Sequence, residues 1–152
     1  MDQTYLVIVN ESDEAKVSLR FVARRAQKTD RGVEVLAIVE PQGFVQWGGV
    51  QAAIEEEDMH RVEALIAEAV GEIVEFAGLK PKITIRQGDP IKVIKAIIDE
   101  RDDIAALVLG AKAGKNPGPI VKHFTGEGAG NLPCPVLLVP GGLDDERIEL
   151  LA

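Results

Sequence analysis

The chain has a single cysteine and no long uninterrupted hydrophobic run. With Cys134 as its only thiol, it cannot form an internal disulfide and offers no set of thiolates for a metal cluster. Its longest apolar runs, such as Ile104 to Leu109, fall far short of the roughly 20 residues that a membrane-spanning helix needs. The first residues lack the charged leader of a secretion signal. We therefore expect a cytoplasmic protein without a membrane partner.

Positive charge is scarce in the chain as a whole. The formal net charge is −8, so we expect the protein to repel nucleic acid and anionic lipid. Residues 110–126 are the exception, because they contain Lys112, Lys115 and Lys122 and no acidic residue. At 46% hydrophobic and 28% charged residues, the composition fits one globular domain. We expect an α/β domain over 1–142 and a short tail over 143–152.

Short strand-like runs alternate with helical patterns along the chain. Strands are predicted at 5–9, 33–39, 83–86, 104–109 and 136–139. The first helix is predicted to begin at Ser12 and Asp13 and to end at about Lys28. A second follows the loop 41–49 and ends at Gly78, a third begins at Pro90, and a fourth begins at Pro119. This order predicts a single-domain α/β fold: a five-stranded parallel sheet with helices on both faces.

The third predicted strand alternates apolar and polar residues, which is typical of an edge strand. The Rossmann-like strand order 3-2-1-4-5 places it at an edge and brings the first and fourth strands side by side. Open α/β sheets bind ligands at such a switch point, beyond the carboxyl ends of the strands. We therefore expect a ligand site formed by the segments after the first, second and fourth strands.

The segment 107–140 contains six of the fifteen glycines. Glycines allow backbone N–H groups to approach an anion closely, and a helix beginning at Pro119 would add unpaired N–H groups. The loop before Pro119 is therefore compatible with a phosphate. The alternative is an ordinary surface turn with solvated lysines. The later glycines at 126–130 are more typical of the end of a helix than of a dinucleotide motif.

Five motifs occur in order along the chain: VIV followed by Asn10, Glu11 and Ser12; VLAIVEP at 35–41; GDP at 88–90; LVLG at 107–110; and PCPVLLVP at 133–140. With them the chain resembles the universal stress protein family over essentially its full length. The resemblance implies a stress-response or regulatory protein that binds an adenine nucleotide such as ATP or AMP, with magnesium in the case of ATP. The binding residues that we infer are Asn10, Glu11, Ser12, Ile38, Gly110, Lys112, Gly114, Lys115, His123, Thr125 and Gly126.

The fifth predicted strand is an edge without a charged residue, which is a liability unless another strand covers it. The resemblance implies antiparallel pairing with a second copy, so we predict a homodimer through Val136, Leu137, Leu138 and Val139. The tail after Leu143 would either add to that interface or fray. Asn10 stands where the family usually has Asp, and the glycines of the loop are displaced. These departures motivate an alternative, a dimeric member that binds no nucleotide and acts through protein contacts.

Groups that could catalyse a reaction are sparse. His60 is predicted to be a solvated surface residue, and Cys134 lies between two prolines with no partner nearby in sequence. We predict no catalytic residue and no metal site, and rank an enzyme that hydrolyses nucleotides last. Phe44 and Trp47 could form a lid or stack on a base, although packing onto the domain is the simpler interpretation.

Overall fold

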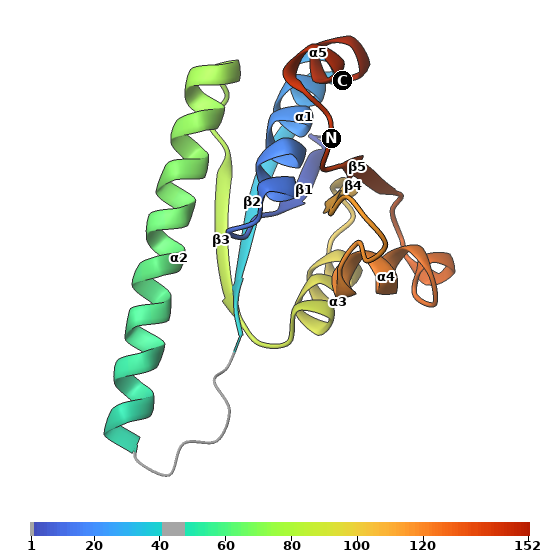
Figure 1. The fold of residues 1–152 in the computed structure, drawn as a ribbon. Coiled ribbons are helices and arrows are strands. Elements are labelled where there is room, and N and C mark those ends of the chain that lie inside the picture. The colour runs from blue at the N-terminus through green and yellow to red at the C-terminus, as the bar shows by residue number, and fades with distance from the viewer. Residues whose placement is uncertain (1, 41–47) are drawn as a thin grey trace.

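The computed structural model of the chain describes residues 2–40 and 48–152. It contains one parallel sheet with the order β3-β2-β1-β4-β5, as predicted (Figure 1). The strands are β1 (Thr4–Ile8), β2 (Gly32–Val39), β3 (Lys82–Gln87), β4 (Ile104–Ala111) and β5 (Val136–Pro140). β1 pairs with β2 on one side and with β4 on the other. The switch point of the sheet therefore lies between β1 and β4.

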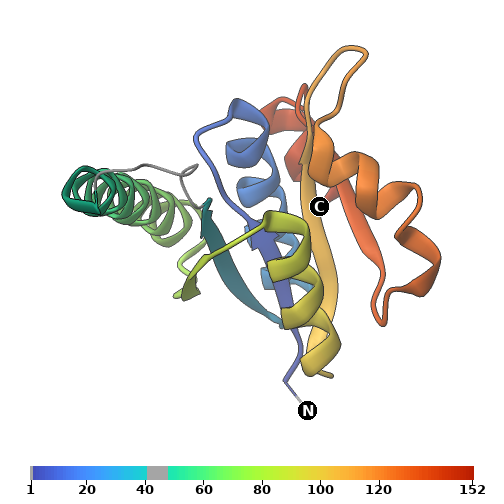
Figure 2. The ribbon, with the colours of Figure 1, turned by 90° about the horizontal axis from the view of Figure 1, so that it is seen from below.

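Helices cover both faces of this sheet. They are α1 (Asp13–Thr29), α2 (Gly48–Ala77), α3 (Pro90–Glu100), α4 (Pro119–Thr125) and α5 (Asp145–Leu151), with a short 3-10 turn at Ala129–Asn131. One face packs against α1, α2 and α5 through side chains such as Leu19, Ile73 and Ile148. The other packs against α3 and α4, where Ile94 and Phe124 are buried (Figure 2). The α/β layering predicted from the sequence is confirmed.

Alternation along the central strand supplies both cores. Tyr5 and Val7 of β1 face the α1 and α2 layer, whereas Leu6 and Ile8 face the α3 and α4 layer. All four are buried, which explains why the strand is a continuous apolar run. β3 lies at an edge, as predicted, but burial along it does not follow the alternation: the apolar Ile83 is 46% exposed, whereas the polar Thr84 is buried and its hydroxyl bonds Glu34.

Short polar residues and glycine begin and end the helices. Ser12 precedes α1, and its hydroxyl accepts a hydrogen bond from the backbone N–H of Ala15 at 3.3 Å. Asp89 has the same role before α3, in which Pro90 is the first residue. α2 ends where Gly78 adopts a positive φ of 65°. The boundary predicted for the fourth strand was wrong, because β4 continues to Ala111 and Gly110 lies inside it.

The C-terminal residues pack against their own domain. They form α5, whose Ile148 is buried. Two ion pairs join α5 to α1, from Arg20 to Asp145 at 2.9 Å and from Arg24 to Glu149 at 2.7 Å. These contacts hold the segment in place, so the fraying predicted as one alternative was wrong, and a part in a dimer interface stays a prediction.

A buried carboxylate lies near the amino ends of the strands. Glu34 of β2 is only 1% exposed, and its two carboxylate oxygens have separate partners. Arg101 donates to one oxygen at 2.7 Å, and the hydroxyl of Thr84 donates to the other at 3.0 Å. Arg101 also makes two hydrogen bonds to Asp103. The guanidinium holds the pKa of the Asp103 carboxyl below its usual range. This network fastens β2, β3 and the start of β4 together.

Candidate functional site at the switch point

Two cavities lie where the chain leaves β1, β2 and β4. The first, the β1–β4 cavity, has a volume of about 130 Å³ and is lined by Ile8, Asn10, Ser12, Glu14, Ala15, Leu109, Gly110, Pro117, Gly118, Pro119, Ile120 and Val121. The second, the β1–β2 cavity, has a volume of about 360 Å³ and is lined by Val9, Asn10, Glu11, Ala37, Ile38, Val39, Glu40, Asp58, Arg61, Val62 and Leu65. Asn10 belongs to both, so the cavities adjoin at this residue.

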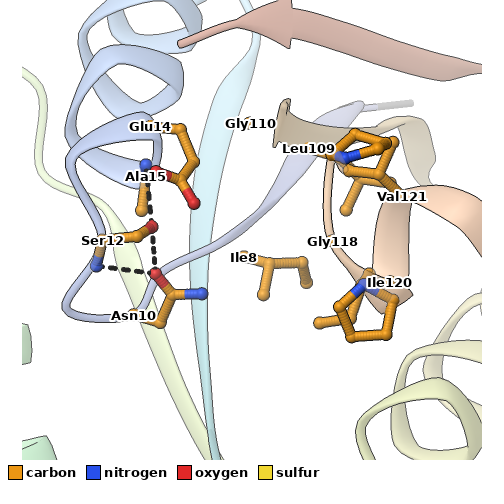
Figure 3. A pocket seen from close by; sticks show the side chains of 12 residues that line it. Ile8, Asn10, Ser12, Glu14, Ala15, Leu109, Gly110, Gly118, Ile120 and Val121 are labelled. Atoms are coloured by element: carbon orange, nitrogen blue, oxygen red, sulfur yellow. Dashed lines mark hydrogen bonds between the residues drawn. The ribbon is translucent and has the colours of Figure 1, made fainter. Parts of the chain in front are cut away.

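The β1–β4 cavity has one polar wall and one apolar wall. Asn10, Ser12 and Glu14, from the β1–α1 turn and the start of α1, lie on one side (Figure 3). Leu109 of β4 and Ile120 of α4 lie on the other side. The polar wall follows from the fold, because the chain turns from β1 into α1 directly above the switch point.

Hydrogen bonds fix the polar wall. The Asn10 side-chain oxygen accepts from the backbone N–H of Ser12 at 2.9 Å and also from the Ser12 hydroxyl. The Ser12 hydroxyl in turn accepts from Ala15. Asn10 thus closes a turn that positions α1, and its amide nitrogen points away from Ser12 toward the cavity (Figure 3). The residue presents hydrogen-bond donors, not a negative charge, to the cavity.

Two glycines determine where Glu14 lies. A Cβ atom at Gly110 would lie 2.4 Å from the carbonyl oxygen of Glu14, and one at Gly141 would lie 2.7 Å from the Glu14 Cβ. Gly110 belongs to β4, and Gly141 directly follows β5. Both strand ends therefore contact the first turn of α1 without an intervening side chain. The space that glycine leaves at position 110 is occupied by the protein itself.

The β1–β2 cavity has apolar walls and a charged rim. Ile38 of β2 and Val62 and Leu65 of α2 contribute its larger apolar side chains. Asp58 and Arg61 form an ion pair at 2.8 Å on the α2 side. The combination of apolar walls with a few polar groups is typical of small-molecule sites.

The structure brings five of the predicted binding residues to these cavities. Asn10, Ser12 and Gly110 line the β1–β4 cavity, and Asn10, Glu11 and Ile38 line the β1–β2 cavity. The predicted lid residues Phe44 and Trp47 lie outside the described residues.

The other predicted binding residues line neither cavity. Lys112, Gly114 and Lys115 lie on the exposed loop between β4 and α4. The hydroxyl of Thr125 donates to the carbonyl of Val121 at 2.7 Å, which is a bond within α4.

The two remaining predicted residues, His123 and Gly126, also have local structural contacts. The ring of His123 lies edge-on to Phe124, and its Nε2 would be 2.7 Å from a Cβ at Gly128. Gly126 follows the last residue of α4, and a Cβ there would lie 2.8 Å from the carbonyl of Lys122. Both residues therefore have a packing role at the end of α4.

The binding residues inferred from the sequence did not include Glu14 or those from Pro117 to Val121, although the loop before Pro119 was expected to lie at the site. Gly118 adopts a φ of 104°, and its N–H donates to the Asn116 side chain at 3.2 Å. This turn directs the loop back across the end of β4. The sequence signal was a glycine between two prolines before an apolar pair.

The described residues show neither a metal centre nor a membrane span. They contain no group of three or more histidine, cysteine or acidic side chains placed to hold a metal ion. No helix among them has the length and apolar character needed to cross a membrane.

The strand order and the parallel sheet place the chain in the class of doubly wound α/β proteins, and its cavities lie at the switch point where ligand sites of this class commonly occur. The model of the universal stress protein family matches residues 1–140. The chain therefore belongs to the universal stress protein family. No curated protein matches it.

Solved structures of this family share the fold at low sequence identity. The universal stress protein UspA from Lactobacillus plantarum is 15% identical, with a TM-score of 0.74 over 90% of this chain and 97% of that one. The Archaeoglobus fulgidus universal stress protein in complex with dAMP is 20% identical, with a TM-score of 0.59 over 91% and 98%. An Arabidopsis thaliana family member with AMP bound is 17% identical, with a TM-score of 0.62 over 94% of each chain.

Proposed function

We propose that the protein binds an adenine nucleotide across the two cavities and acts as a regulatory or stress-response module. The observation that carries this proposal is the arrangement at the switch point, where two cavities that each combine apolar side chains with a few polar groups adjoin at Asn10. A nucleotide combines a flat, largely apolar base with a polar sugar phosphate, and so needs both kinds of surface.

The base belongs in the β1–β2 cavity. Its volume of about 360 Å³ lies within the range of ligand pockets. Ile38 and Val62 present apolar surface to the faces of a base, and the rim carries hydrogen-bonding groups for its edge. The relatives solved with AMP and dAMP support adenine as the base.

In this arrangement the phosphate groups of the nucleotide point toward the loop between β4 and α4. Lys112 and Lys115 are exposed there, next to the segment 117–121 that lines the β1–β4 cavity. AMP places less negative charge near the carboxylates of the site than ATP does. Magnesium enters this proposal only as a companion of ATP, bound mainly through the phosphates.

Calorimetry tests the proposal with a matched pair of valines on α2. Val62 lines the β1–β2 cavity, whereas Val74 is 48% exposed and lines neither cavity. We expect nucleotide-free protein to bind AMP and Val62→Glu to weaken binding by about tenfold or more, because a carboxylate would be buried against the base. Val74→Glu should bind as the wild type does.

Absence of heat and of thermal shift with AMP, ADP and ATP would contradict nucleotide binding. It would favour the alternative of a family member that acts through protein contacts. One observation favours that alternative: Lys112 and Lys115 lie outside both cavities, while Glu11, Glu14 and Glu40 line them. A phosphate-release assay with magnesium and ATP tests the enzyme hypothesis separately.

We also propose a homodimer through β5, whose outer edge is free in the described chain. Val139 is buried and Leu138 is 42% exposed. An uncharged edge strand of this kind is suited to pairing with a second copy. Light scattering should give twice the chain mass of 16.4 kDa. Leu138→Lys should give the monomer mass, while Leu150→Lys, at a 70% exposed position of α5, should leave the mass unchanged.

A cytoplasmic location remains part of the proposal. The single thiol of Cys134 suits a reducing compartment. Fractionation of cells that express the full chain tests this directly, and recovery in the membrane or secreted fraction would contradict it.

A further inference from the structure

We infer that the side of α1 that contacts α5 is a docking surface for an acidic amphipathic helix of a partner protein, and that α5 occupies this surface in the free protein as an internal competitor. The surface, which we call the α1 face, consists of Arg20, Arg24 and Lys28 with the apolar side chains of α1 that cluster with Ile148. None of its residues lines either cavity, and its role is independent of nucleotide binding.

The cations of the α1 face are evenly spaced. Arg20, Arg24 and Lys28 are four residues apart, so they lie in one row along the helix. Like charges at this spacing destabilise a helix unless opposite charges lie nearby. In a chain with a formal net charge of −8, such a row is a local positive surface that attracts an acidic ligand.

The contacts of α5 show which kind of segment this row binds. Asp145 pairs with Arg20 at 2.9 Å. Glu149, one helical turn later, pairs with Arg24 at 2.7 Å. The Nζ of Lys28 donates to main-chain oxygens at the end of α5, at 3.2 and 2.7 Å. The two helices therefore lie side by side and run in the same direction, with acids and cations in register (Figure 1).

Arg24 is held in position by residues outside α5. Its guanidinium lies 4.2 Å from the centre of the Phe76 ring of α2, and its Nη1 donates to the Gln27 side chain at 2.9 Å. Both contacts persist when α5 leaves. An arginine that is already ordered loses less side-chain freedom when it binds a carboxylate. The α1 face is therefore preformed for an acidic segment.

The contacts that hold α5 are of a kind that a partner can replace. Ile148 and Ala152 are the only buried residues among 145–152, and the two ion pairs lie at the surface, where such pairs contribute little stability. α5 has seven residues, fewer than the roughly 12–15 that an isolated helix needs. A longer helix with the same pattern makes these contacts at a lower cost in ordering, and so displaces α5.

The structure also indicates what the partner segment contains. It is an acidic helix with an apolar residue between two acids four residues apart, as Ile148 lies between Asp145 and Glu149. α5 of a second copy has this pattern, but the four residues 141–144 that join it to β5 span at most about 14 Å, which ties it to its own domain. A separate protein has no such restriction.

Fluorescence anisotropy tests the α1 face with a labelled synthetic peptide of residues 142–152. The host is the full chain with Ile148→Asp, which removes the 1% exposed side chain of α5 and so vacates the face. We expect the peptide to bind this variant about tenfold or more tightly than the wild type, in which α5 blocks the face. Leu150→Asp, at a 70% exposed position, should bind as weakly as the wild type.

Two further substitutions test recognition. In the Ile148→Asp host, Arg24→Gln should weaken peptide binding by about threefold or more, because it removes the ordered partner of Glu149. Arg25→Gln is the matched control, because Arg25 is exposed on the same helix and its side chain interacts with Tyr5. A peptide that itself carries Ile148→Asp should not bind the host.

Hydrogen exchange on the wild type gives a second measurement that needs no variant. Unlabelled peptide at about 1 mM is comparable with the effective concentration of a segment on a short tether. It should displace α5 and speed the exchange of amides 145–152 by about threefold or more, while the amides of β1 remain unchanged.

Equal binding of the peptide to the wild type and to the Ile148→Asp host would overturn the inference. So would binding that Arg24→Gln leaves unchanged, no binding to a host that circular dichroism shows to be folded, or unchanged exchange at 145–152. If wild-type protein displaced the labelled peptide from the host as well as free peptide does, the occupant would be α5 of a second copy, and the assignment to a separate partner would be wrong. If the host does not fold, the exchange measurement decides.

Discussion

Replacing Gly110 with alanine should destabilise the fold and weaken the site together. A Cβ at this position would lie 2.4 Å from the carbonyl oxygen of Glu14 and 2.8 Å from its carbonyl carbon. Both atoms belong to the backbone, so no side chain can rotate out of the way. β4 and α1 would have to separate by more than half an ångström to reach even a close contact. Overpacking of this kind costs about 1–3 kcal/mol.

The loss is large enough to measure by thermal unfolding. For a domain of this size each kcal/mol lowers Tm by about 2–4 °C, so we expect a decrease of about 2–12 °C. Gly142→Ala is the matched control, because nothing lies within 4 Å of a Cβ at that position. Its Tm should match the wild type within experimental error.

Ligand binding provides the second measurement on the same variant. Separation of β4 from α1 displaces Glu14, so Gly110→Ala should also bind AMP less tightly than Gly142→Ala does. A Gly110→Ala protein with the Tm and the AMP affinity of the wild type would refute the reasoning. That result would mean that β4 and α1 can move apart to make room for a methyl group without a loss of stability.

Three further predictions concern other parts of the molecule. Arg101→Met removes the close ion partner of buried Glu34 and leaves the exposed Lys82, whose Nζ is 3.7 Å from Glu34 Oε1, so it should lower the urea-derived free energy of unfolding by up to about 3–5 kcal/mol. Lys95→Met at an exposed pair should change it by about 0.5 kcal/mol or less. Arg101 lowers the pKa of the Asp103 carboxyl, so this ion pair stabilises the fold above the ordinary Asp pKa of 3.8, and that stabilisation is lost as the pH falls below 3.8. Urea unfolding at several pH values should show that Arg101→Met loses less stability over this acid range than the wild type does. Burial raises the pKa of the Cys134 thiol, so at pH 8 a disulfide reagent should modify it more slowly in folded than in urea-unfolded protein, and equal rates would contradict this.

The strand order could be predicted because its signals are local. The uninterrupted apolar residues of β1 indicate a strand covered on both faces, and the alternation in β3 indicates an edge. Ser12, Asp89 and Pro90 mark helix starts through side-chain or ring geometry that depends only on nearby residues. Right-handed crossovers then leave few ways to arrange the elements.

The details of the site could not be predicted because they depend on contacts between distant segments. In the sequence Glu14 is an ordinary acid in the first turn of a helix, where it would be favourable in any protein. Only the approach of β4 and of Gly141 shows that its backbone is confined. Gly110 lines the β1–β4 cavity, but its small size serves the packing of α1 against β4, and its part in binding stays a prediction.

For two predicted lysines the sequence shows the charge but not the position relative to the cavities. Lys112 and Lys115 are prominent in the sequence because their surroundings lack acidic residues. Charge counted along the chain says nothing of which side of a loop faces a cavity. In the structure the cavity is lined by the later segment from Pro117 to Val121, where no charged residue occurs.

Because Gly141 lies directly against Glu14, the first turn of α1 and the end of β5 should move together. Side chains between layers normally change rotamer and absorb small displacements, but here the backbone of one element touches a side-chain stem of the other directly. A displacement of the outer strand β5 should therefore also displace Glu14 in the wall of the β1–β4 cavity, because no flexible side chain lies between them. In this part of the molecule stiffness comes from the absence of side chains.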